Sequence, residues 1–527
     1  MVTEDAVRTE EISAAPAETA VRAWRPTFAT YAAVAAVLAW FAVQLAPYIG
    51  EAPDLDAMIS LRESIVFHRD GLDGLIADRV GTGIHPPLMD LLTSLSFSLF
   101  GEDPRSQQLL AIPFFAVLAA AVERLLAPWL PTGQRVFAAL AVAMCPALAI
   151  VMVLVTREGL IVVLLAAALA VALAPTQGKR HLLVLSAVLA LLPLTKDACL
   201  VLVVPFAVFA ALTGEPAAWA QRLRRGVTVL ALPVAASLCW RAVLALAHGS
   251  SWHTWIVSPR ADDGPYVVAL RAMFGFEKGI YLRQNLANAF IVNFLWVPAL
   301  LALATLVLLW RRPAPAALVR SVALLGGLVA MSVWTTLTFP TFTVPRYAAP
   351  VIFFTLLIAL LGLTLWPPRA RPYVLGALIG AFALGAWSPT DPVTRKIWGT
   401  VSVGGERVYD TAERERGPDR TAINFAALRA TQRMNARLRR IFATDVTMVT
   451  GDCNSMKFGE KLFSVGFQPG AFDRGIPAAR PIRCVPLDQL PAGAAEGPDK
   501  IGLVRTSEED AANQPLPVSG KAIVVLR

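Results

Sequence analysis

The chain has 527 residues, of which 56% are apolar and 16% are charged, and its mean hydropathy is +0.58. This composition excludes a single soluble domain and indicates a membrane protein. The formal charge of +9 does not indicate nucleic-acid binding, because zinc-finger spacing is absent and the arginines lie mostly between apolar segments.

The charged residues are unevenly distributed along the chain. Residues 27–388 carry 41 of the 85 Asp, Glu, Lys and Arg residues, about 11% of that stretch, whereas residues 389–527 carry 36, about 26%. We therefore predict a polytopic α-helical membrane body over 27–388 and a soluble domain over 389–527. Residues 1–26 mix acids with arginines and lack the features of a secretory signal, which predicts a disordered cytoplasmic tail.

Spanning helices of roughly 20 mostly apolar residues can be sought directly in the membrane body. About eleven candidates lie near residues 27–49, 108–130, 134–153, 158–174, 181–195, 197–213, 227–247, 286–310, 318–339, 347–366 and 372–388. One set of alternate short turns holds twelve Lys and Arg residues, and the opposite set holds three, Arg157, Lys196 and Arg346. Because cationic loops stay in the cytoplasm, this asymmetry predicts that the N-terminus is cytoplasmic and that the domain formed by residues 389–527 is periplasmic.

The tail shows β-rich runs after a predicted helix. The helix is expected over Thr421–Phe442, and the runs are Val446–Thr450, Ile501–Val504 and Ala522–Leu526, separated by glycine and proline. This pattern predicts a small α/β domain.

The five cysteines divide between the body and the tail. Cys145, Cys199 and Cys239 fall in apolar stretches and are expected to behave as small buried hydrophobic residues. Cys453 and Cys484 lie in the tail, where a periplasmic location permits a disulfide between them. Two unpaired thiols are the alternative.

A loop of nearly sixty residues, 50–107, separates the first two predicted spans and is expected to be periplasmic. Long ordered loops are usually functional. This one contains Asp54 and Asp56 soon after the first span and His85 before two prolines. The apolar run Leu88–Phe100 is too short to span comfortably, so we predict an interfacial helix there.

The turns on the same side hold most of the remaining charges beside the spans. Arg157 and Glu158 occupy one turn, Lys196 and Asp197 another, and Arg346 lies beside a third. Charges next to spans tend to face the protein interior and to mark a pathway or a site. Taken singly, each of these residues could instead end a helix or pair with a neighbour.

Such a set suits transfer of a sugar from a lipid phosphate. Arginine and lysine at the bilayer edge are suited to phosphate oxygens, and a carboxylate could take a proton from an attacking hydroxyl. The cations would also stabilise the departing phosphate as charge develops on it.

The motifs of the body resemble those of a known group of membrane enzymes. They are Asp54-Leu-Asp56, His85-Pro-Pro-Leu88, Leu99-Phe100-Gly101, Thr156-Arg157-Glu158, Leu194-Thr195-Lys196 and Pro345-Arg346-Tyr347. The chain resembles the GT-C membrane glycosyltransferases, in particular the dolichyl-phosphate-mannose protein mannosyltransferase and aminoarabinose transferase relatives (glycosyltransferase family 39-like). The resemblance implies a GT-C bundle of about 11 transmembrane helices, a periplasmic active site, a polyprenyl-phosphate sugar donor and inversion at the anomeric carbon.

The resemblance also implies roles for individual residues. The expected roles are catalytic base for Asp54 or Asp56, donor phosphate binding for His85, Arg157, Lys196 and Arg346, and support for Glu158, Asp197 and Tyr347. Two departures from the family pattern leave alternatives open. The usual Asp-Glu doublet is Asp54-Leu-Asp56 here, so either aspartate could be the base, and Asp54 is favoured. His85 stands where lysine is common, so a phosphate contact would depend on protonation or on a neutral N–H donor.

We therefore predict a glycosyltransferase of a bacterial-type inner membrane that moves a sugar to an envelope lipid, glycan or protein. The expected partners are membrane lipids, the polyprenyl-phosphate-linked sugar and the acceptor, without a metal or other cofactor. A flippase for a lipid-linked substrate is one alternative, but transporters place ionisable groups near the midplane and often show inverted repeats. A glycan-binding scaffold that acts through its tail is the other.

Overall fold

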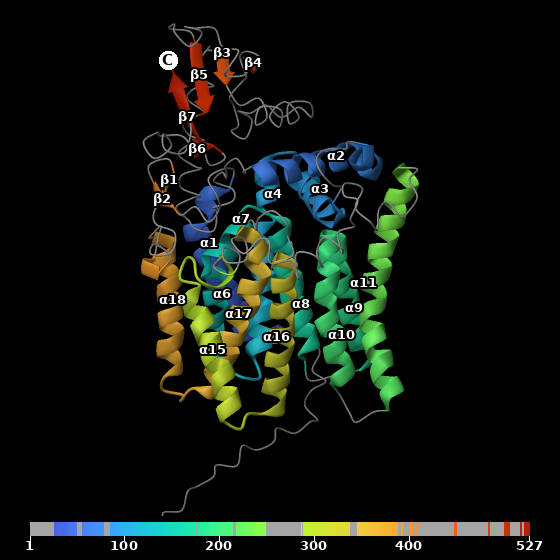
Figure 1. Ribbon diagram of the computed structural model, residues 1–527, viewed down its shortest axis with the longest axis vertical. Coiled ribbons are helices and arrows are strands. Elements are labelled where there is room, and N and C mark those ends of the chain that lie inside the picture. Colours follow the sequence, from blue (N-terminus) through green and yellow to red (C-terminus); the bar gives the residue numbers. More distant parts are fainter. Residues whose placement is uncertain are drawn as a thin grey trace, which may run out of the picture.

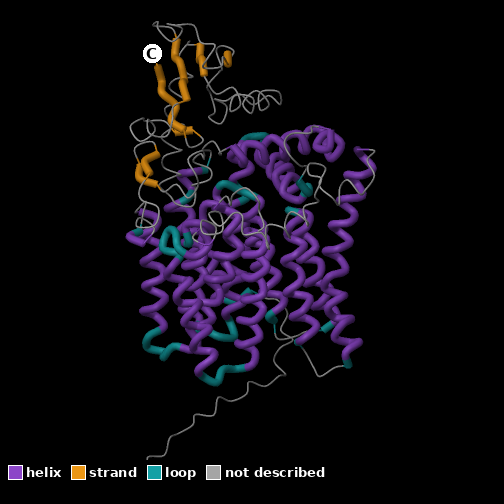
Figure 2. Tube along the Cα trace, viewed as in Figure 1, coloured by secondary structure: helices purple, strands orange, loops and turns teal. Residues whose placement is uncertain are grey.

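The computed structural model describes residues 26–49, 55–77, 85–174, 178–213, 218–248, 286, 288–337, 345–387 and 391–393, together with seven short strands beyond residue 400. The helices form a bundle, with α2 (Leu55–Ala77) and α3 (Leu88–Phe100) across one end of it (Figure 1). Helix is the dominant structure in the described body, and strands lie only in the described part of the tail (Figure 2).

The bundle is built from helices that coincide with the predicted apolar stretches. These helices are α1 (Phe28–Gln44), α5 (Ala111–Leu126), α6 (Thr132–Met144), α7 (Pro146–Val153), α8 (Arg157–Ala172), α9 (Lys179–Thr195), α10 (Val203–Leu212), α11 (Trp219–His248), α15 (Trp296–Arg311), α16 (Ala316–Leu337), α17 (Ala349–Gly362) and α18 (Arg371–Trp387). The shorter elements are α4 (Pro104–Gln108) and the 3-10 helices η2 (Ala46–Tyr48), η3 (Asp197–Leu202), η5 (Pro345–Ala348) and η6 (Leu363–Leu365).

The protein is a multi-pass membrane protein. Among the described residues four helices are long and apolar enough to cross a membrane, at Arg105–Leu126, Trp219–Leu244, Ala316–Trp334 and Arg346–Leu365. The pair α6 and α7 adds a fifth if it is one span bent by 66°. Several other apolar helices are shorter, and the count of eleven spans remains a prediction.

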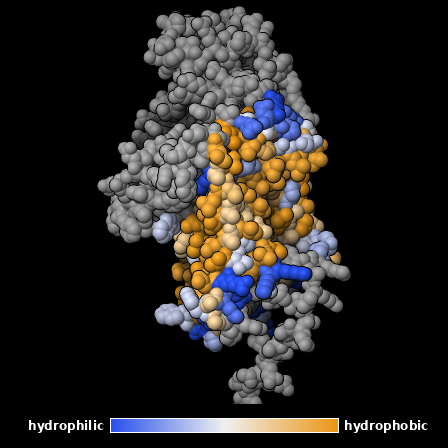
Figure 3. Space-filling model, turned by 90° about the vertical axis from the view of Figure 1, so that its right-hand side faces the viewer, coloured by the Kyte–Doolittle hydropathy of each residue, from blue (hydrophilic) through white to orange (hydrophobic). Residues whose placement is uncertain are grey.

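The surface of the bundle carries an apolar belt. On the face shown in Figure 3, apolar side chains cover the middle of the helices and polar side chains gather at both ends. The exposed side chains of α11 include Leu223, Val227, Leu232 and Leu238. An apolar belt with polar ends is the surface that a helical bundle presents to lipid.

Two helices form the centre of the bundle. Every residue of α17 is buried, and α8 is buried along almost its whole length. α17 packs on α15 and α16, whereas α8 packs on α5 and α9. Gly362 permits the close crossing of α17 and α15, because a side chain there would collide with Thr305.

The described tail contains β1 (Val401–Val403), β2 (Glu406–Val408), β3 (Thr447–Thr450), β4 (Arg483–Cys484), β5 (Lys500–Arg505), β6 (Pro517–Val518) and β7 (Lys521–Leu526). β1 and β2 pair antiparallel, with Val401 opposite Val408. The other strands follow the order β4-β3-β5-β7-β6, in which β3 pairs parallel with β4 and β5. β3, β5 and β7 lie at the three predicted β-rich runs. The predicted helix Thr421–Phe442 falls outside the described residues, so the α/β class of this domain remains a prediction.

The cysteines follow the expectation in part. Cys145 and Cys199 are buried, but Cys239 is exposed on α11, so the prediction that Cys239 is buried is wrong. An apolar residue of a spanning helix can face lipid as readily as the protein core. Cys453 lies outside the described residues and Cys484 belongs to β4, so their disulfide remains a prediction.

Candidate active site

The turn between α7 and α8 holds Arg157 and Glu158 in place. The amide of Thr156 donates to the Val151 carbonyl at 3.1 Å, and the amide of Val155 donates to Met152 at 3.1 Å. These two bonds form a Schellman motif, whose left-handed position usually holds glycine. Here that position is Val155, with φ of 49°, and strained backbone of this kind clusters at functional sites.

The first turn of α8 is equally constrained. The Thr156 side chain caps the helix by accepting from the Gly159 amide at 3.4 Å. A Cβ at Gly159 would lie 2.7 Å from the Val151 carbonyl oxygen, so the end of α7 approaches α8 only because this residue is glycine. The turn therefore fixes the position of the first residues of α8, from which the Arg157 and Glu158 side chains extend.

Arg157 reaches out of the bundle to α2. Its Nη2 lies 2.6 Å from Glu63 Oε2, and its Nη1 donates to the Ser60 hydroxyl at 2.7 Å. Asp90 Oδ2 of α3 is 3.7 Å from the same Nη2. All of these side chains are buried. One guanidinium thus joins α2, α3 and α8.

Glu158 lies close to the other two predicted cationic side chains, Lys196 and Arg346. Lys196 Nζ lies 3.0 Å from Glu158 Oε1, and Arg346 Nε lies 3.7 Å from Glu158 Oε2. Lys196 Nζ also stands 4.0 Å from the centre of the Tyr347 ring, a cation–π contact. These residues come from α8, from the residue after α9 and from η5, so three segments meet at one carboxylate.

His85 shares this environment. The positive charge of Arg157, then burial, then the charges of Lys196 and Arg346 hold the pKa of His85 well below its ordinary value of 6.5. The imidazole is therefore neutral at physiological pH, and a contact to phosphate would run through a neutral N–H. Of the two alternatives that the sequence left open for His85, this one is favoured.

The pKa values of Asp90 and Lys196 are also shifted. Burial raises the pKa of Asp90, and the nearby Arg157 offsets this only in part. Burial lowers the pKa of Lys196, but the charge and hydrogen bond of Glu158, together with Tyr347 and Cys199, raise it by more, so the pKa lies above the ordinary lysine value. Lys196 is therefore a permanent cation at the site.

The structure does not place two of the predicted site residues, and it places a third on another helix. Asp54 lies outside the described residues, and of Asp56 only the backbone is described, in the first turn of α2. Asp197 turns away from Lys196 and pairs with Arg241 of α11, with 3.2 Å between Oδ2 and Nη2. The ion pair described for Asp197 therefore joins it to α11 and not to Lys196, Arg346 or Glu158, so it does not support a role for Asp197 in phosphate binding.

The sequence did not single out Ser60, Glu63 or Asp90. A signal was available: Ser60 and Glu63 follow Asp56 at helical spacings of four and seven residues, and Asp90 is the one acid in the apolar run Leu88–Phe100. An acid in a long polar loop has many possible partners, and only the folded chain shows which one it meets.

The arrangement favours an anion. α8 and α17 both begin at this end of the bundle, and helix N-termini carry partial positive charge. Two cations share the single Glu158 carboxylate, which a phosphate could replace or join. Among the described residues, no group of three His, Cys, Asp or Glu side chains could hold a metal ion.

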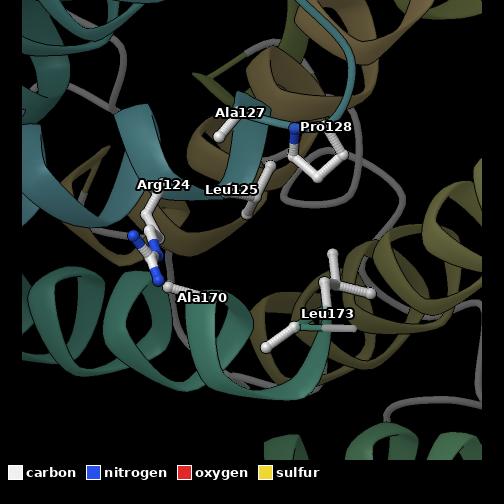
Figure 4. A pocket seen from close by; sticks show the side chains of 7 residues that line it. Arg124, Leu125, Ala127, Pro128, Ala170 and Leu173 are labelled. Atoms are coloured by element: carbon white, nitrogen blue, oxygen red, sulfur yellow. The ribbon is translucent and has the colours of Figure 1, made fainter. Parts of the chain in front are cut away.

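A small pocket lies elsewhere. It has a volume of about 160 Å³ and is lined by Arg124, Leu125, Ala127, Pro128, Ala170, Leu173 and Ala174 (Figure 4). Its walls follow the far ends of α5 and α8, so it is about one length of α8, roughly 24 Å, from Arg157. None of the candidate site residues lines it.

Comparison with known proteins confirms the predicted resemblance. The family model of dolichyl-phosphate-mannose-protein mannosyltransferases matches residues 84–257, a stretch that contains His85, Arg157 and Lys196. Asp54, Asp56 and Arg346 lie outside it. No curated protein matches the chain.

Two solved structures are also similar. ArnT from Cupriavidus metallidurans bound to undecaprenyl phosphate has 13% identity and a TM-score of 0.48, with 94% of this chain and 97% of that chain covered. The apo state of the same protein has 13% identity and a TM-score of 0.45, with 94% and 98% covered.

Proposed function

We propose that the protein transfers a sugar from a polyprenyl-phosphate donor to an acceptor of the cell envelope, at the periplasmic side of the inner membrane. The observation that carries this proposal is the meeting of Lys196, Arg346 and Glu158 next to the neutral His85, at the end of the bundle covered by α2 and α3. The family match over residues 84–257 supports the same reaction class.

Each residue then has a task in donor binding. Lys196 and Arg346 hold the phosphate oxygens, and His85 donates a neutral N–H to them. Glu158 and Tyr347 keep the two cations in place before the donor arrives. The lipid chain of the donor would lie in the apolar belt, so the phosphate stands at the membrane surface where these side chains gather.

The chemical step needs a base on the acceptor side. Asp54 or Asp56 takes the proton from the acceptor hydroxyl, whose oxygen attacks the anomeric carbon of the sugar. The bond between that carbon and the phosphate oxygen breaks, and polyprenyl phosphate leaves with both bonding electrons. Lys196 and Arg346 stabilise the charge that develops on the leaving phosphate.

The test uses the purified full-length protein in nanodiscs. A panel of radiolabelled undecaprenyl-phosphate sugars is offered together with envelope fractions from cells that lack the protein. We expect label to pass from one of these donors to an envelope component. Asp54→Asn or Asp56→Asn should abolish transfer, whereas Asp73→Asn, at an exposed acid of the same helix α2, should not.

The outcomes separate this proposal from its competitors. Full activity in both single aspartate variants and in the double variant would refute the base assignment. Movement of the labelled lipid across the bilayer without bond cleavage would identify a flippase. Glycan binding that survives loss of both aspartates but not deletion of residues 400–527 would identify a scaffold.

A further inference from the structure

We infer that Arg157 is a positioning residue: its bonds to Ser60 and Glu63 hold α2 in the register that places the base over the donor. The inference rests on the proposed function and assigns Arg157 a different task from phosphate binding. Its guanidinium is engaged on two sides, at 2.6 Å by the Glu63 carboxylate and at 2.7 Å by the Ser60 hydroxyl.

The burial of these groups makes the contact strong. The side chains of Arg157 and Glu63 are only 8% and 5% exposed. Removing one partner of a buried pair leaves an uncompensated charge, which is far more costly than breaking an exposed pair. A donor phosphate that recruited Arg157 would have to displace Glu63 from a contact of 2.6 Å, whereas Lys196 and Arg346 share the single Glu158 carboxylate at 3.0 and 3.7 Å.

The contact is close along the helix to Asp56, one of the two candidate bases. Position 56 lies one turn before Ser60 in α2, about 6 Å along the helix axis at 1.5 Å per residue. Ser60 and Glu63 are themselves one turn apart, so Arg157 contacts two successive turns of α2. A rotation or shift of this part of α2 would therefore move position 56 by a similar amount.

The contacts at the far end of α2 do not fix the position of its first turns. There Ile76 and Leu72 pack on Trp240 and Leu244 of α11. Between the two ends Gly71 has φ of 68°, which breaks the helix. The backbone can bend at this glycine, so the packing on α11 does not determine the orientation of the part that begins at Leu55.

Side-chain bonds also link α2 to α3. Ser64 donates to Asp90 of α3 at 2.8 Å, and Arg69 pairs at 2.6 Å with Glu102, two residues after the end of α3. The second pair is partly exposed, with side chains 42% and 23% accessible, and neither of its residues belongs to α8. Arg69→Gln is therefore a matched control that removes an ion pair between α2 and a residue outside α8.

The experiment compares Glu63→Gln, Ser60→Ala and Arg157→Lys with Arg69→Gln and Lys196→Ala. Three quantities are measured in nanodiscs: the Kd for undecaprenyl phosphate, kcat with the donor that the panel above identifies, and hydrogen exchange of the α2 amides. Glu63→Gln should lower kcat about 10- to 100-fold, as expected for displacement of a reacting group by about 1 Å. Its Kd for undecaprenyl phosphate should change less than about threefold, and exchange over residues 55–70 should speed up.

The other variants complete the pattern. Ser60→Ala should act in the same direction but less, and Arg157→Lys should restore little, because one ammonium cannot reproduce the fork that meets two partners. Arg69→Gln should match the wild type in kcat, whereas Lys196→Ala should weaken undecaprenyl phosphate binding.

Several results would overturn the inference. One is a tenfold or greater rise of the Kd in Arg157→Lys while Glu63→Gln and Ser60→Ala keep wild-type kcat and Kd, which would make Arg157 a phosphate ligand. Another is unchanged α2 exchange in Glu63→Gln, and a third is faster exchange with unchanged kcat. The exchange measurement stands without a donor, so an absence of sugar transfer in the wild type would count against the proposed function and not against this contact.

Discussion

Gly159→Ala tests whether the turn that presents Arg157 and Glu158 depends on close packing of backbone on backbone. The added Cβ would lie 2.7 Å from the Val151 carbonyl oxygen and 3.3 Å from the Met152 Cα. These atoms belong to the main chain of α7 and cannot rotate away, so α7 and α8 must move apart. Overpacking of a buried site by one methyl group typically costs about 1–3 kcal/mol. We expect a loss of stability in that range.

Gly376→Ala in α18 is the matched control. No atom lies within 4 Å of the position that its Cβ would take, and alanine is favoured over glycine inside a helix by roughly 0.5–1 kcal/mol. The two variants should therefore shift the melting temperature of the detergent-solubilised protein in opposite directions, as followed by tryptophan fluorescence. Gly159→Ala should also weaken undecaprenyl phosphate binding, because Glu158 shifts with the helix.

The opposite result would be a Gly159→Ala protein that melts at or above the wild-type temperature and binds undecaprenyl phosphate as tightly as the wild type. Such a result would mean that α7 can retreat without cost and that the strained turn at Val155 does not constrain the site. A drop in melting temperature with unchanged binding would confine the effect to stability.

Three further predictions concern other parts of the structure. Lys196→Ala should weaken undecaprenyl phosphate binding about 10- to 100-fold, since a charged hydrogen bond contributes about 1.5–3 kcal/mol. Lys196→Arg should bind undecaprenyl phosphate more tightly than Lys196→Ala in the same titration. Equal affinities of the two variants would contradict a charge contact. Because the pKa of His85 is lowered in the folded protein, the unfolded chain takes up more protons as the pH falls below about 6.5. The melting temperature of the wild type should therefore fall more than that of His85→Gln between pH 7.5 and 5.5, and equal losses would count against a neutral His85 imidazole. Gly362→Ala should lower the melting temperature because the added methyl group collides with Thr305, whereas Gly380→Ala, which has open space around it, should not. Equal melting temperatures of the two variants would show that α15 and α17 can separate freely.

The sequence predicts the helices well because the bilayer imposes a simple length rule on apolar segments. It also predicts that Leu88–Phe100 forms a separate helix, which is α3. It does not predict which side of a helix faces the protein. Leu91, Leu95 and Leu99 of α3 are exposed while Asp90 and Thr93 are buried. In a membrane protein lipid and core are both apolar, so hydropathy alone cannot tell them apart.

The candidate site was predictable as a gathering of charges, but its pairings were not. Lys196 and Arg346 meet at Glu158 as the positions of their turns on one side of the membrane indicate. Arg157 instead contacts Glu63, 94 positions earlier in the chain. An ion pair between segments so far apart depends on how α2 lies over the bundle, and no local pattern encodes that placement.

The two halves of the proposed reaction rest on elements of different rigidity. Glu158 stands at the start of α8, and Arg346 stands in η5 directly before α17. Both helices are buried along nearly their whole lengths, so the phosphate half is built into the centre of the bundle. On the base side, Asp56 belongs to α2, which lies across one end of the bundle and is interrupted at Gly71. Catalysis requires the two halves to agree within about 1 Å, because misplacement on that scale costs orders of magnitude in rate. Substitutions at the joint between them, at Ser60, Glu63 and Arg157, should therefore impair turnover more than equally conservative changes at the lipid-facing surface of the spans.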